Sequence, residues 1–167
     1  QVNSSTYTVT VNTGTGAGTL RLDIDDNDSI VDLGLSANPI GGEGANNGDY
    51  TSGEFYTVDR LAPTVSSINR ASANPTNASS VAFTVQFSED VSGVNAADFS
   101  LTTTGLSGSS LGTITQNSAN NYTVNVNVGT GTGTLRLDVT DNDSIIDGWT
   151  NPLGGAGAGN GNFTTGQ

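Results

Sequence analysis

The stretch Gly133-Thr134-Leu135-Arg136-Leu137-Asp138-Val139-Thr140-Asp141-Asn142-Asp143-Ser144-Ile145-Ile146-Asp147 indicates the fold class of this chain. Apolar and polar residues alternate in its first half. This places Leu135, Leu137 and Val139 on one face and is typical of a half-buried β-strand. The same stretch occurs earlier as Gly18–Asp32, so the chain uses one strand-and-loop element twice.

The second half of the stretch predicts a cation site. Asp138, Asp141, Asp143 and Asp147 lie within ten residues, with no basic residue between them. Carboxylates this close repel one another and raise each other's pKa values. A calcium ion removes that repulsion and takes about six to eight oxygen ligands at flexible geometry. The alternative is that these side chains cap turns, a position that Asp and Asn favour in any protein.

Internal homology determines the domain organisation. Tyr7–Asp32 aligns with Tyr122–Asp147 at an offset of 115 residues, and 20 of the 26 positions are identical. After a two-residue deletion, Asn38–Glu54 aligns with Asn151–Gln167 at an offset of 113 residues. A repeat of this length is close to one immunoglobulin-like (Ig-like) sandwich of about 100 residues.

The homology divides the chain into two parts. We expect residues 1–60 to be the C-terminal half of one repeat, and residues 61–167 to be a nearly complete following repeat. Pro63 forces an extended backbone at the boundary, as a short stiff linker requires. A half repeat cannot bury its apolar face alone, so neighbouring copies of the repeat, in a polymer or a tandem array, are the expected partners.

Composition excludes several functions. The 167 residues include four Arg and sixteen acidic residues, for a net charge of −12, and no Cys or His. Such a charge repels nucleic acid and anionic membranes, and no apolar run is long enough for membrane insertion. Without Cys, His or Lys the chain offers no usual nucleophile and base pair, so we expect no enzyme. A metal ion is the one cross-link that this composition still allows.

The alternating segments predict an all-β fold. Strands are expected over 64–68, 81–87, 99–103, 112–115, 122–128 and 134–139, with first-copy strands over 7–11, 19–24 and 50–58. The glycines of 129–133 predict a turn. Short strands with polar, Gly-rich connections are typical of antiparallel Ig-like β-sandwich repeats, here one partial and one nearly complete.

Three segments, at the boundary and in the second copy, carry a family resemblance. They are the linker Val58–Val65, the run Phe83–Val94 and the tripeptide Ala97–Phe99. In these the chain resembles the bacterial Ig-like, cadherin-like tandem repeats of large extracellular surface proteins and adhesins. The resemblance implies an extracellular, cell-surface location in a prokaryote, a structural role in a fibre, filament or adhesin stalk, and calcium at the domain junctions.

We expect the calcium ligands to come from the linker and from two loops that meet at one pole of the sandwich, together with the equivalent residues of the first copy. The candidate metal ligands are Asp23, Asp26, Asp28, Asp32, Asp59, Glu89, Asp90, Asp98, Asp138, Asp141, Asp143 and Asp147.

Two further side-chain types have a structural and a functional interpretation. Arg21 and Arg136 lie beside the acidic loops, where a salt bridge to Asp is expected. Trp149 lies in the long Gly-rich loop, where it either folds over the edge of the sandwich or stacks on a sugar. A glycan-binding accessory module of a secreted enzyme or adhesin is therefore the alternative function, with glycans as partners.

Overall fold

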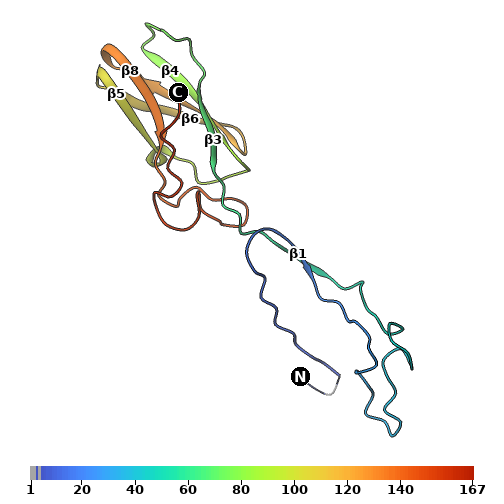
Figure 1. Ribbon diagram of the computed structural model, residues 1–167. Coiled ribbons are helices and arrows are strands. Elements are labelled where there is room, and N and C mark those ends of the chain that lie inside the picture. Colours follow the sequence, from blue (N-terminus) through green and yellow to red (C-terminus); the bar gives the residue numbers. More distant parts are fainter. Residues whose placement is uncertain (1–2, 4) are drawn as a thin grey trace. The chain divides into compact units, whose positions relative to one another are not determined.

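The computed structural model describes residues 3 and 5–167 and divides the chain into two compact units, Gln1–Arg60 and Leu61–Gln167. Among the described residues every regular element is a strand except one 3-10 turn, η1 (Ala96–Asp98). All strand pairs are antiparallel (Figure 1). The predicted all-β fold is confirmed.

The second unit consists of two sheets (Figure 1). The larger sheet has the order β3-β4-β7-β6, with β3 at Val65–Arg70, β4 at Ser80–Phe87, β7 at Asn121–Asn127 and β6 at Ser110–Ser118. The smaller sheet pairs β5 (Phe99–Ser107) with β8 (Thr130–Val139).

Alternating side chains of these strands form the core of the second unit. Phe83 and Val85 of β4 lie opposite Val124 and Tyr122 of β7, and all four are buried. The rings of Phe87 and Tyr122 meet edge to face with their centroids 5.8 Å apart, a favourable aromatic geometry. The β8 side chains predicted to share a face are buried or half-buried on the side of this core.

The sequence predicts a turn at residues 129–133, but most of this segment belongs to strand β8. Only Val128 and Gly129 connect β7 to β8, and β8 already begins at Thr130. A Cβ atom on Gly131 or Gly133 would collide with the backbone oxygen of Gly105 or Thr104 in β5. These two glycines therefore permit close contact of two strands at an irregularity of the β5–β8 register.

Among residues 5–60 the first unit has one small sheet, β1 (Gly18–Arg21) paired with β2 (Phe55–Val58), and an Ile24–Tyr50 bridge that continues it. The segment 7–11 is predicted as a strand but does not belong to one. Its counterpart in the second unit is β7, which pairs with β4 and β6, and neither of those strands has a counterpart among residues 5–60.

The same residues are consequently buried in one unit and exposed in the other. Val9 of the first unit is 56% exposed, whereas Val124, its counterpart in β7, is 0% exposed. Leu22 and Leu137 differ in the same way, at 55% and 0%. The first unit thus presents an apolar face that the opening strands cover in the second unit.

Candidate functional site

The Gly-rich loop that follows β8 is organised around Asp141. This carboxylate is only 5% exposed, and it accepts hydrogen bonds from the backbone N–H groups of Asp143, Gly159 and Gly161 at 3.0–3.1 Å. The Asp141 N–H in turn donates to the side-chain oxygen of Asn162 at 2.7 Å. One buried carboxylate therefore holds both ends of the loop together.

Asp143 holds the middle of the same loop. Its backbone has a positive φ of 63°, a conformation that Asp and Asn tolerate better than most residues. Both of its carboxylate oxygens accept the N–H of Gly157, at 3.1 and 3.2 Å. The charge of Asp143 is thus directed at backbone amides of the Gly-rich segment.

Asp147 closes the first turn of the loop. Its carboxylate accepts the N–H groups of Trp149 and Asn151 at 2.7 and 2.9 Å, and the Asn151 side-chain amide at 2.8 Å. Burial raises the pKa of the Asp147 carboxyl, but these bonds and one from the Thr150 amide outweigh burial, so its pKa lies below the ordinary value.

The first copy repeats this arrangement. Asp26 accepts the N–H groups of Asp28 and Gly48, as Asp141 does those of Asp143 and Gly161. Asp28 accepts the N–H of Gly44 and has the same positive φ as Asp143. Asp49 takes the place of Asn162 and accepts the N–H of Asp26 at 2.7 Å.

Asp32 is the counterpart of Asp147 in the first copy. It accepts both the side chain and the N–H of Asn38, at 3.0 and 3.1 Å, and the N–H of Gly34. The Asn38 side chain contributes most to lowering the pKa of Asp32, and the Gly34 and Asn38 amides add to it. The aligned asparagines were not predicted as partners, although their recurrence at Asn38 and Asn151 is a signal for this role.

Asp98 connects the acidic loop to the segment before β5. It is 0% exposed, accepts the Asn95 N–H at 2.7 Å, and completes a capping box at η1. The Ser144 hydroxyl donates to its other carboxylate oxygen at 2.6 Å. Each oxygen of this carboxylate therefore accepts a hydrogen bond from an uncharged donor, and the two donors belong to segments that are distant in sequence.

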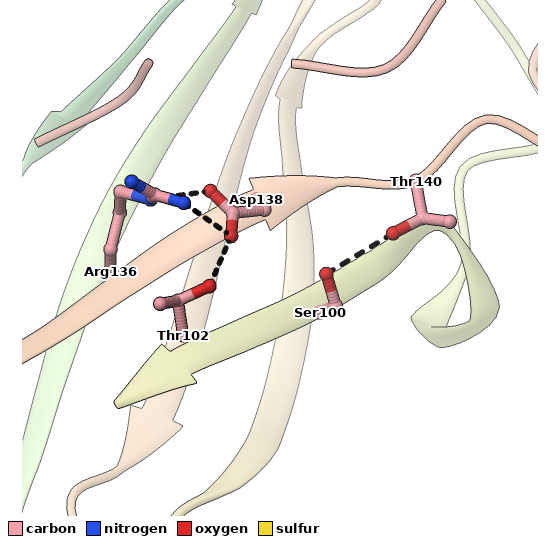
Figure 2. A network of polar contacts seen from close by, with 5 residues as sticks. All are labelled: Ser100, Thr102, Arg136, Asp138 and Thr140. Atoms are coloured by element: carbon pink, nitrogen blue, oxygen red, sulfur yellow. Dashed lines mark hydrogen bonds and ion pairs between the residues drawn. The ribbon is translucent and has the colours of Figure 1, made fainter. Parts of the chain in front are cut away.

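Asp138 and Asp23 each pair with an arginine, which confirms the predicted salt bridges. The Nε atoms of Arg136 and Arg21 donate to them at 2.7 and 2.6 Å. Asp138 also accepts the Thr102 hydroxyl across the β5–β8 sheet, beside a contact between the hydroxyls of Ser100 and Thr140 (Figure 2). Hydrogen bonding to Asp138 raises the pKa of Arg136, and the equivalent bond from Arg21 lowers the pKa of Asp23.

Glu89 and Asp147 bring two loops of the second unit together. Carboxylate oxygens of these residues lie within 4.8 Å of each other, Glu89 coming from the loop after β4. Such an acidic group could hold a metal ion, and Asp59, the linker residue predicted as a further ligand, belongs to the first unit. Asp90, the neighbour of Glu89, is exposed.

The structure thus divides the predicted ligands by their surroundings. The largest set faces backbone and side-chain donors, as residues that shape a loop do: Asp26, Asp28, Asp32, Asp98, Asp141, Asp143 and Asp147. Hydrogen-bond donors therefore offset much of the repulsion between these carboxylates. That repulsion was the reason for predicting a calcium ion. Asp147 belongs both to this set and to the acidic group.

Trp149 lies at the surface of the loop, where its side chain is 53% exposed.

No family model matches the chain, and no curated protein or solved structure is significantly similar to it. No helix among the described residues is long and apolar enough to cross a membrane.

Proposed function

We propose that this chain is a structural repeat module of an extracellular fibre, filament or adhesin stalk, stiffened by calcium at its acidic loops and domain junction. The observation that carries the proposal is the reuse of one loop design. Both copies direct the same carboxylates at the same backbone amides of a Gly-rich loop. Because these side chains shape a loop in each repeat, they fit a structural role better than a catalytic one.

The sheet order supports the proposed relationship to bacterial Ig-like repeats. Numbered from β3, the larger sheet of the second unit contains its strands in the order first, second, fifth, fourth. The smaller sheet pairs the third and sixth strands. Constant-type Ig domains have the same order in their two sheets, with a seventh strand beside the sixth.

Within this proposal the calcium ion binds between Glu89, Asp147 and the linker residue Asp59. Carboxylates of the second unit within 4.8 Å of each other support it, because two negative charges at that separation favour a bound cation. Backbone carbonyls and water would supply the remaining oxygens. A ligand contributed by the linker is what would make the ion restrict motion at the junction.

Thermal unfolding of the full chain in calcium and in excess chelator tests the proposal. An ion that binds only the folded state adds about 2.7 kcal/mol at one hundred times its Kd, which raises Tm by about 10 °C for a unit of this size. Glu89→Gln should abolish most of this shift, whereas Glu43→Gln, an exposed glutamate of the first unit, should preserve it. Equal Tm values in calcium and chelator would overturn the calcium role.

The exposed Trp149 is the one observation that favours the alternative, a glycan-binding module. An indole half open to solvent can stack on a sugar ring. Screening the full chain on a glycan array, beside Trp149→Ala, distinguishes the two functions. Saturable binding that Trp149→Ala abolishes would favour the glycan-binding module over the spacer.

A further inference from the structure

The sequence contains two Asn-Gly pairs, Asn160-Gly161 and Asn47-Gly48, which lie at aligned positions of the two Gly-rich loops. Glycine is the following residue that leaves an asparagine side chain least stable, because no Cβ atom hinders attack of its backbone nitrogen on the side-chain amide. Both loops nevertheless require the glycine, since a Cβ there would lie 2.6 Å or 2.7 Å from a backbone oxygen.

The second unit holds both reacting groups of its pair in hydrogen bonds. The Gly161 N–H donates at 3.1 Å to Asp141, a buried carboxylate. The Asn160 side-chain amide donates to the backbone carbonyls of Gly155 and Ala156 at 3.0 and 3.1 Å. The Gly161 nitrogen must lose its proton before it can attack, and a negative charge beside it disfavours the nitrogen anion. These bonds therefore oppose the reaction while the loop is ordered.

The first unit protects its pair in the same way. The Gly48 N–H donates to the buried Asp26 carboxylate at 3.0 Å. The Asn47 side-chain amide donates to the backbone carbonyls of Gly42 and Glu43 at 3.2 and 3.0 Å. Each bond of the second unit thus has a counterpart in the first, although the two units differ in what packs around their strands.

We propose that Asn160 and its counterpart Asn47 are deamidation sites that the buried carboxylate of each loop keeps closed. When the loop opens, the glycine nitrogen forms a bond to the side-chain carbon of the asparagine. The carbon–nitrogen bond of the side-chain amide breaks, and ammonia leaves with the proton of the glycine N–H. Water then opens the five-membered ring at either carbonyl and leaves aspartate or isoaspartate. The reaction needs only water, and both asparagines are exposed.

The product does not restore the loop. A carboxylate at position 160 cannot donate to the Gly155 and Ala156 carbonyls, and it adds a negative charge near Asp141. Isoaspartate also lengthens the backbone by a methylene group. Each deamidation therefore makes the loop open more easily and marks the age of the chain irreversibly. This inference goes beyond the proposed repeat function and does not depend on calcium.

Peptide mapping by mass spectrometry tests the protection. The full chain is incubated in mildly alkaline buffer containing excess chelator, with and without urea, and conversion of each asparagine is followed over time. We expect both Asn-Gly sites to react at least about tenfold more slowly in the native chain than in urea, because the native reaction requires the loop to open first. Equal rates with and without urea would overturn the proposal.

Two matched substitutions test the assigned carboxylates. Asp141→Ala should accelerate the reaction at Asn160 several-fold and leave Asn47 unchanged, whereas Asp26→Ala should do the reverse. Val124→Ala is the control for general destabilisation, because it weakens the core of the second unit and removes no bond of the loop. Equal acceleration of Asn160 by Asp141→Ala and Val124→Ala would overturn the role of the carboxylate. The comparison with urea remains decisive where a variant fails to fold.

A substitution that imitates the product tests the consequence for the loop. Asn160→Asp should lower the midpoint of urea unfolding, because it removes the donor to two carbonyls. Asn77→Asp adds the same charge at an exposed asparagine of another loop and should leave the midpoint nearly unchanged. Equal midpoints for the two variants would overturn the claim that deamidation opens the loop.

Discussion

Replacing Asp141 with alanine tests the account of the Gly-rich loop. The substitution removes the acceptor of three backbone N–H groups, those of Asp143, Gly159 and Gly161. It acts on a side chain that is only 5% exposed. Because residues 154–161 carry only two alanines and one asparagine besides glycine, we expect these bonds to contribute most of what keeps that segment ordered.

The magnitude follows from the number and environment of the bonds. A hydrogen bond to a charged group contributes about 1.5–3 kcal/mol, and a buried donor without an acceptor costs about 1–3 kcal/mol. Gly159 is exposed and Gly161 half-buried, so water replaces part of the loss. We therefore expect Asp141→Ala to reduce the free energy of unfolding by roughly 2–4 kcal/mol, below the simple sum of three bonds.

Urea unfolding in excess chelator measures this loss separately from any loss of metal binding. Circular dichroism follows the sheets, and the fluorescence of Trp149, the one tryptophan, follows the loop. Asp90→Ala is the matched control, because it removes the same charge from an exposed side chain and should cost less than about 0.5 kcal/mol. If Asp141→Ala costs no more than Asp90→Ala, the loop does not depend on its carboxylate and our reasoning is wrong.

Three further predictions concern single residues. The pKa of Asp147 is lowered in the fold, so its stabilising effect is present above about pH 4 and is lost as the pH falls. The difference in urea midpoint between wild type and Asp147→Asn should therefore shrink from pH 6 to pH 2. A constant difference would contradict this. Gly161→Ala should reduce the free energy of unfolding by roughly 1–3 kcal/mol in the same assay, because its Cβ would lie 2.6 Å from the Leu153 backbone oxygen. In Gly148→Ala the added Cβ meets nothing within 4 Å, so this variant should be nearly neutral. Val124→Ala should reduce the free energy of unfolding by about 2–3 kcal/mol, and Val9→Ala, at its exposed counterpart, by under about 0.5 kcal/mol. Similar losses for the two variants would show that the first unit buries its apolar face.

Strand alternation made the second unit predictable. Tyr122, Val124 and Val126 share one face in the sequence and are all buried in β7, because period-two patterning is a local property that the sheet preserves. The identical pattern at Tyr7, Val9 and Val11 gave a wrong strand, because a strand also needs neighbours to pair with. The conformation of this segment depends on residues outside it.

The acidic loops were predictable as loops but not in their internal bonding. Acid spacing alone does not distinguish a carboxylate that binds a cation from one that accepts backbone amides, since both need clustered oxygens. The amides belong to glycines such as Gly159, eighteen residues from Asp141, and no local pattern connects them. Internal homology is a signal that could have pointed to both partners, because acids and glycines recur together in the two copies.

The role of calcium at the junction is tested most directly by ¹⁵N relaxation of the full chain, which measures rotational correlation times of the two units separately. In calcium we expect the correlation times of residues 5–60 and 61–167 to coincide, since a shared ion would make the units tumble together. In chelator, and for Glu89→Gln in calcium, they should separate as the linker becomes free to bend. Correlation times that are the same in calcium and in chelator would contradict the account of this chain as a calcium-stiffened repeat.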